Sequence, residues 1–138
     1  MLNKLNYKGY NRIAIINAGD EFLEKVSGKY SEVIIDTEID QRCAYSFMLI
    51  FVTTIREVNN ISPLALHNLT ADGTLWFCYP KKYAKKFSRE PEYYKSWKSL
   101  NDMGFHGTRM VSVDEYWSAL RFRNIKYIKS GPGKSAGK

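Results

Sequence analysis

Long apolar runs are missing from this sequence. The longest, Tyr45 to Val52, is eight residues, whereas a helix that crosses a bilayer needs about 20. The first residues are mixed polar, which is not the pattern of a cleavable signal peptide. We therefore expect a cytoplasmic protein that has no membrane partner.

Cysteine and histidine are scarce. The chain has two of each: Cys43, Cys78, His67 and His106. None of them stands beside another candidate ligand at the spacing that zinc sites use. We expect two reduced thiols in or near the core and no metal site.

A glycine-rich phosphate loop is also absent. Gly19, after the first apolar run, is followed by Asp20 and Glu21, and these carboxylates would repel a phosphate at the helix N-terminus. The C-terminal segment 131–138 resembles a phosphate loop, but Ile128 stands where that motif needs a glycine. No serine lies in a Gly-x-Ser-x-Gly elbow, so the catalytic residues are unknown from sequence.

Positive charge is abundant, with a net charge of +7 over 138 residues. The length fits one domain, which we expect at 1–124, followed by a disordered basic tail at 125–138. Four basic residues lie within 81–86 and three lie in the last ten positions. This distribution favours a solubilising role for the charge and leaves nucleic-acid binding through the loop and tail as an alternative.

Strand and helix patterns alternate along the chain. Apolar or alternating segments predict strands at 12–17, 31–36, 45–52, 74–79, 107–113 and 116–123. Helical spacing is found at 20–28, 55–61, 64–72 and 91–103. We therefore expect an α/β fold: a three-layer, Rossmann-like sheet of about six strands, mostly parallel with an antiparallel C-terminal hairpin.

Several residues predict where the helices begin and end. Asp20 is expected to cap the first helix and Gly28 to end it. Pro63 is expected to break the second helix, because proline has no amide hydrogen to donate. A new helix would then restart at Ser62 and close near Gly73.

Three segments carry a family resemblance: Leu75–Lys82, Ser88–Arg89 and, most specifically, Asp114–Arg123. With them the chain resembles the bacterial domain-of-unknown-function family 3052 over nearly all of its expected ordered part. The resemblance implies a reduced class I methyltransferase-like fold with strand order 2-1-3-4-6-5, and it implies no activity. The chain departs from the family at Gly19, where proline is frequent.

The ends of the first two strands supply the candidate cofactor-binding residues. Ligands of open α/β sheets bind at the carboxyl ends of the strands. Asn17 and Gly19 follow the first strand, and Asp36 ends the second at the place where such folds keep an acid for ribose hydroxyls. A protein that uses S-adenosylmethionine (SAM) would employ Asp36 in this way. Because aspartates at strand ends commonly form turns or cap helices, we expect that role for Asp36 and no cofactor, with SAM as the alternative.

Tyr79, Lys81 and Arg89 are candidate ligand-binding residues. Tyr79 and Lys81 lie where the fourth strand ends at Pro80, and a lysine there offers a compact charge on a long stem to a phosphate or carboxylate. Arg89 belongs to one of the segments that match the family. The alternative for Lys81 is a place in a solvated basic loop.

The last strand adds two more candidates. Alternation places Trp117, Arg121 and Arg123 on one face, which suits an anion or an aromatic ligand. The alternatives are an edge strand protected by charge, or an Arg121 that pairs with Asp114 or Glu115 across the turn.

Three functions follow from these observations. The first is a small non-catalytic protein that binds a small anion or a protein partner near Lys81. The second is a reduced SAM-dependent methyltransferase that holds the ribose with Asp36. The third is nucleic-acid binding through the basic loop and tail.

Overall fold

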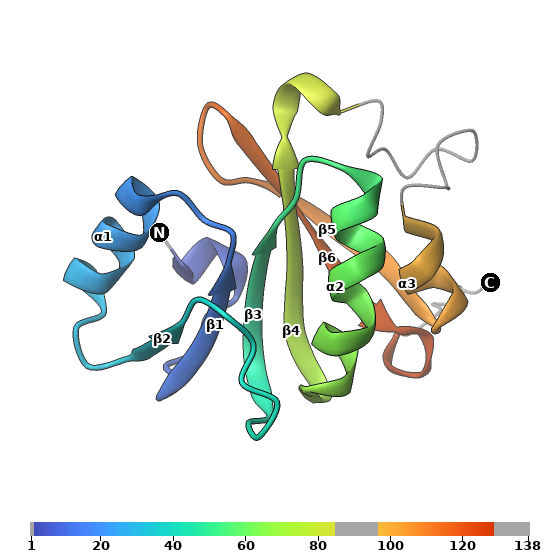
Figure 1. Ribbon diagram of the computed structural model, residues 1–138, viewed down its shortest axis with the longest axis horizontal. Coiled ribbons are helices and arrows are strands. Elements are labelled where there is room, and N and C mark those ends of the chain that lie inside the picture. Colours follow the sequence, from blue (N-terminus) through green and yellow to red (C-terminus); the bar gives the residue numbers. More distant parts are fainter. Residues whose placement is uncertain (1, 85–96, 129–138) are drawn as a thin grey trace.

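Six strands form one sheet in the computed structural model, which describes residues 2–84 and 97–128. The order is β2-β1-β3-β4-β6-β5, with β1 to β4 parallel and β4–β6 and β5–β6 antiparallel (Figure 1). The strands are β1 Arg12–Ile16, β2 Ile34–Asp36, β3 Tyr45–Phe51, β4 Leu69–Pro80, β5 Phe105–Ser112 and β6 Trp117–Asn124. The predicted α/β class, the strand order and the antiparallel hairpin are confirmed.

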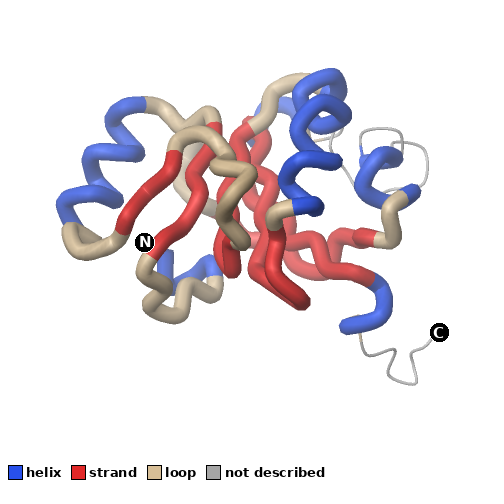
Figure 2. Tube along the Cα trace, turned by 60° about the horizontal axis from the view of Figure 1, so that its bottom comes forward, coloured by secondary structure: helices blue, strands red, loops and turns tan. Residues whose placement is uncertain are grey.

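Helices cover both faces of the sheet. On one face lie α2 (Ile55–His67) and α3 (Lys98–Asp102), which belong to a core cluster with Phe77 and Phe122. On the other lie a 3-10 turn, η1 (Leu2–Leu5), and α1 (Asp20–Lys29). Figure 2 shows the strands between these layers. In the part of the chain that the structure describes, no helix is long and apolar enough to cross a membrane.

β3 and β4 form the buried centre of the sheet. Every residue from Gly73 to Pro80 is buried, and the side chains of β4 alternate between the two core clusters. The indole of Trp76 has no exposed surface and donates a hydrogen bond of 2.7 Å to the carbonyl oxygen of Leu5. That bond ties η1 to the sheet and satisfies a polar group that would otherwise be buried without a partner.

Pro63 does not break the second helix, which corrects the sequence prediction. A single helix, α2, follows the N-cap residue Thr54 and contains Pro63. Thr54 forms a capping box with Glu57 in the first turn of this helix. Val58 and Ala65, on either side of the proline, are fully buried. Tertiary packing therefore outweighs the loss of one helical hydrogen bond, about 3 kcal/mol in a helix interior.

β4 also begins earlier than predicted, at Leu69 and not at Thr74. Leu69 pairs with Tyr45, and the next pair joins Thr74 to Phe47, so residues 70–73 leave the regular register. Asn68 fixes this start, because its backbone oxygen accepts from the amide of Tyr45 at 2.7 Å. The predicted helical spacing of 64–72 therefore holds only as far as His67.

Smaller differences concern helix ends. Gly19, not Asp20, is the N-cap of α1, and this helix continues through Gly28. The helical spacing predicted for 91–103 ends just before Gly104, whose left-handed φ of +87° is typical of a helix C-terminus. The predicted start of that helix at position 91 and the residue Arg89 lie outside the described residues.

The first residues of the predicted tail, 125–127, have regular structure. Ile125–Tyr127 is a 3-10 turn, and the amide of Ile125 donates to the carbonyl oxygen of Gly104 at 2.8 Å. The expectation of disorder from residue 125 is therefore wrong for these three residues. Residues 129–138 lie outside the described part of the chain.

Two glycines should respond in opposite directions to alanine. A Cβ at Gly73 would lie 2.8 Å from side-chain atoms of Leu69 and Thr70, whereas a Cβ at Gly28 meets no atom within 4 Å. We expect Gly73→Ala to lower the free energy of unfolding by about 1–3 kcal/mol. Gly28→Ala should raise it by about 0.5–1 kcal/mol through helix propensity. Urea titration of both variants measures their free energies of unfolding. Equal changes in the two variants would contradict the close packing around Gly73 in β4.

Candidate ligand-binding site

The carboxyl ends of β1 and β3 are held together by Asn17. This residue has a left-handed backbone with φ of +61°, which asparagine tolerates better than most residues. Its side-chain amide donates to the carbonyl oxygen of Phe51 at 3.4 Å. Asn17 therefore shapes the turn that leads from β1 into α1.

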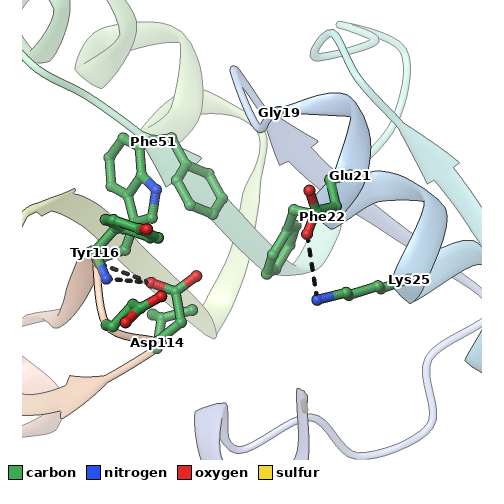
Figure 3. A pocket seen from close by; sticks show the side chains of 10 residues that line it. Gly19, Glu21, Phe22, Lys25, Phe51, Asp114 and Tyr116 are labelled. Carbon is green, nitrogen blue, oxygen red and sulfur yellow. Dashed lines mark hydrogen bonds and ion pairs between the residues drawn. The ribbon is translucent and has the colours of Figure 1, made fainter.

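A hollow of about 350 Å³ opens at this edge, between α1 and the connection from β5 to β6. We call it the α1–hairpin hollow. Figure 3 shows Glu21, Phe22 and Lys25 on one side and Asp114 and Tyr116 on the other. Its lining residues are Gly19, Glu21, Phe22, Lys25, Phe51 and the hairpin connection 113–117.

Three aromatic rings form a continuous wall of this hollow. The ring centroids of Phe22 and Phe51 are 5.2 Å apart, and those of Phe51 and Trp117 are 4.9 Å apart, both edge to face. Phe51 is buried between the other two rings, whereas Phe22 and Trp117 are half-buried and keep accessible surface in the hollow. The wall can therefore take a planar ring or a cation.

The charge of the α1–hairpin hollow is negative although the whole chain is positive. Glu21, Asp114 and Glu115 line it, and Lys25 is its one basic residue among those described. Lys25 lies 3.5 Å from Glu21, so that pair is neutral. One oxygen of Asp114 accepts from the amides of Tyr116 and Trp117, both at 2.8 Å, and this turn holds the connection in place.

A second hollow of about 640 Å³ lies next to the first and shares the residues 115–117. We call it the Lys81 hollow, because Lys81, Lys82 and Thr53 line it. The amide of Lys81 donates to the carbonyl oxygen of Tyr116 at 2.8 Å, and its Nζ donates to Ser112 Oγ at 2.6 Å. The two hollows therefore carry opposite charge on either side of one segment.

Asp36 lies away from both hollows. It pairs with Ala14, two residues before the end of β1, and so lies about 7 Å back from the sheet edge. Its Oδ2 accepts from Arg12 Nε at 2.7 Å and from the hydroxyl of Tyr45 at 2.5 Å. Its Oδ1 accepts from Arg12 Nη2 at 3.2 Å. The structure thus gives Asp36 a structural role, and its predicted contact with a ribose stays a prediction.

The pKa values of this group follow from the same contacts. The hydrogen bond from Arg12 lowers the pKa of Asp36, more than burial raises it. Burial and the bond to Asp36 raise the pKa of Tyr45 to about 12. Near neutral pH, Asp36 is therefore a charged carboxylate that accepts hydrogen bonds from the Arg12 guanidinium and from the neutral phenol of Tyr45.

The other predicted residues fall into different places. Gly19, Lys81 and Trp117 line the hollows. Tyr79 is buried and donates to Met110 Sδ at 3.1 Å, so it belongs to the core. Arg121 does not pair with Asp114 or Glu115; the aspartate near it is Asp72.

Sequence reasoning missed the aromatic wall. Phe22 lies within the predicted helix at 20–28 and Phe51 within the predicted strand at 45–52, and neither was predicted as a site residue. Each lies at the end of its element nearest the hollow. The available signal was an aromatic residue in the first turn of the first helix together with one at the end of the strand at 45–52.

Cys43 and Cys78 are free thiols, and Cys78 is buried. Within the described ranges, no group of three or more His, Cys, Asp or Glu could hold a metal ion.

The Asp36 group gives a pH-dependent prediction. Asp36→Asn should lower the free energy of unfolding by about 1–3 kcal/mol at pH 7, because it removes a charge-assisted pair. The pKa of the folded-state carboxyl is below the unfolded value of about 4. Its contribution is therefore present above pH 4 and is lost as the pH falls through the folded value. The difference between wild type and variant should therefore shrink as the pH falls below about 4.

Asp102→Asn is the matched control for this measurement. Asp102 forms an exposed pair with Lys98 at 2.7 Å, with more than half of each side chain accessible, and such pairs contribute less than about 1 kcal/mol. Urea midpoints across the pH range measure both variants. Equal effects of the two substitutions would contradict the structural role of Asp36.

The fold is similar to that of several solved methyltransferases. A SAM-dependent methyltransferase from Aquifex aeolicus aligns at 15% identity and TM-score 0.53, over 88% of this chain and 86% of that one. The N-methyltransferase NodS from Bradyrhizobium japonicum aligns at 12% and 0.51, over 89% and 92%. Aeropyrum pernix fibrillarin, solved with natively bound S-adenosyl-L-methionine, aligns at 12% and 0.51, over 80% and 55%.

No family model matches the sequence, and no curated protein matches it either. The resemblance to domain-of-unknown-function family 3052 is therefore without support from sequence comparison. The structural likeness supports the broader part of that resemblance. The protein has the Rossmann-like α/β fold of class I SAM-dependent methyltransferases.

Proposed function

We propose that this protein binds SAM in the α1–hairpin hollow and is a small methyltransferase. The observation that carries the proposal is the hollow itself. It lies at the carboxyl edge of β1 and β3, where sheets of this type bind their ligands. Its volume of about 350 Å³ lies in the range of small-molecule sites.

The chemistry of the lining suits this ligand. SAM carries a sulfonium and an ammonium group and has no phosphate. The acidic start of α1, which disfavours a phosphate, therefore does not disfavour SAM. Asp114 and Glu115, which have no basic partner among the ion pairs of the described residues, offer negative charge to the two cations. The half-buried rings of Phe22 and Trp117 offer faces to adenine or to the sulfonium.

The contacts of Asp36 restrict how SAM could bind. A ribose hydroxyl at Asp36 would compete with Arg12 and Tyr45 for the same two oxygens. We therefore assign the SAM contacts to the hollow lining, with Gly19 as the position of closest backbone approach. Binding through Asp36 remains the alternative prediction.

The Lys81 hollow is the place for the methyl acceptor. SAM supplies a methyl group that a nucleophile takes as the carbon–sulfur bond breaks, and the electron pair remains on the sulfur. The shared residues 115–117 place the two hollows side by side. Lys81 and Lys82 favour an acceptor that carries negative charge.

Binding can be tested by filling the hollow. A Cβ at Gly19 meets no atom within 4 Å, and the φ of −71° accepts any residue. We expect Gly19→Leu to weaken SAM binding at least tenfold, because its side chain would occupy the space of the ligand. Gly28→Leu is the matched control on the same helix, since a Cβ there also meets no atom within 4 Å.

Calorimetric titration and thermal melting with SAM measure both variants. Wild type should gain about 2.7 kcal/mol of stability at a SAM concentration 100 times its dissociation constant. Absence of heat and of any melting shift at about 1 mM SAM would refute the proposal. Binding by wild type that both leucine variants retain equally would place SAM elsewhere.

A non-catalytic protein that binds an anion or a partner near Lys81 is the second candidate. The observation that favours it is the basic lining of the Lys81 hollow. The SAM titration separates the two candidates, because the second requires no SAM. Membership in domain-of-unknown-function family 3052 and a cytoplasmic location remain predictions.

A further inference from the structure

Three arginines gather on one face of the β5–β6 hairpin, away from both hollows. Arg109 of β5 is the direct partner of Arg121 of β6, and Arg123 follows on the same face of β6. Val111 and Ala119 continue that face and pack in the same core cluster as α1. We call Arg109, Arg121 and Arg123 the arginine cluster. It begins about 13 Å along β6 from Trp117.

Arg121 is the centre of the cluster and is incompletely satisfied. Its Nε is buried and has no hydrogen-bond partner among the described residues. Burial lowers the pKa of its guanidinium, and the neighbouring charges of Arg123 and Arg109 lower it further. A charged group taken out of water without a partner destabilises the fold.

The arginine cluster has little acidic charge near it. Asp72 accepts from Arg123 at 2.6 and 3.0 Å, so its two oxygens are already engaged. Among the ion pairs of the described residues, none includes Arg109 or Arg121. The cluster therefore keeps a surplus of about two positive charges.

Two other arginines, Arg12 and Arg42, have acidic partners. Arg12 is paired with Asp36 and Asp40, and Arg42 is paired with Asp40. Each of these arginines has a structural acid within 3.4 Å. Arg109 and Arg121 are like-charged partners placed directly opposite each other, an arrangement that strands disfavour unless something compensates.

We propose that the arginine cluster binds the phosphate backbone of a nucleic acid. A guanidinium presents a planar fork of donors that fits a phosphate. Arg121 and Arg123 are two residues apart on one strand face, about 7 Å, so the cluster extends over more than one phosphate group. The net charge of +7 adds attraction at longer range. The arginine cluster is separate from the α1–hairpin hollow, and this proposal does not depend on SAM binding there.

The test uses the full chain and a fluorescein-labelled oligouridylate of about 20 nucleotides, titrated at several salt concentrations. Arg109→Gln and Arg121→Gln should each weaken binding and lower the magnitude of the slope of log K against log salt by about 1. Arg56→Gln is the matched control, because Arg56 is exposed on α2, on the opposite face of the sheet. It should leave the slope nearly unchanged.

Thermal melting distinguishes a binding role from a structural one. Arg121→Gln should keep or raise the melting temperature, because the substitution removes a partly buried charge without an acid partner. A fall in melting temperature together with unchanged RNA affinity would mean that Arg121 serves the fold, and would overturn the proposal.

Two further outcomes would also overturn the proposal. Equal loss of affinity in all three variants would show that only net charge matters. Stabilisation of wild type by inorganic pyrophosphate, with no binding of the oligouridylate, would identify a site for a small phosphate anion instead.

Discussion

The position of β4 inside the sheet is the constraint on which the rest of the structure depends. It is bonded on one side to β3 and on the other to β6, and its residues from Gly73 onward are buried. The buried part of such a strand has no place for a charged side chain, so charge lies only before Gly73 and after Pro80. Pro80 is its last residue and lies directly opposite Trp117. Lys81 and the hairpin connection therefore meet at the sheet edge, and both hollows form there.

The sequence predicted the parts of the fold that depend on local pattern. The apolar run from Tyr45 to Val52 indicated an interior strand, and β3 is interior. Prediction failed where distant packing decides: Pro63 stays helical because the helix is buried on both sides of it. The end of the second strand identified Asp36, but its partners Arg12 and Tyr45 are distant in sequence, so its ion pair was not visible in the pattern.

The distribution of charge differs from what the sequence indicated. In the sequence, basic residues concentrate in the loop at 81–86 and in the tail. The folded chain adds a third group, because antiparallel pairing brings Arg109 opposite Arg121. Linear spacing cannot show this, since twelve positions separate the two residues in sequence. The same folding collects acids at the α1–hairpin hollow, so a positive protein presents a negative site.

The connection between β5 and β6 joins the features of the sheet edge. Asp114 holds it through two backbone amides, and Tyr116 accepts from the amide of Lys81. Residues 115–117 therefore form a wall of both hollows at once. A ligand that packs against Trp117 from the α1 side meets the segment that also shapes the Lys81 hollow. The two hollows thus share one wall, the arrangement that the proposed transfer of a methyl group between two bound molecules requires.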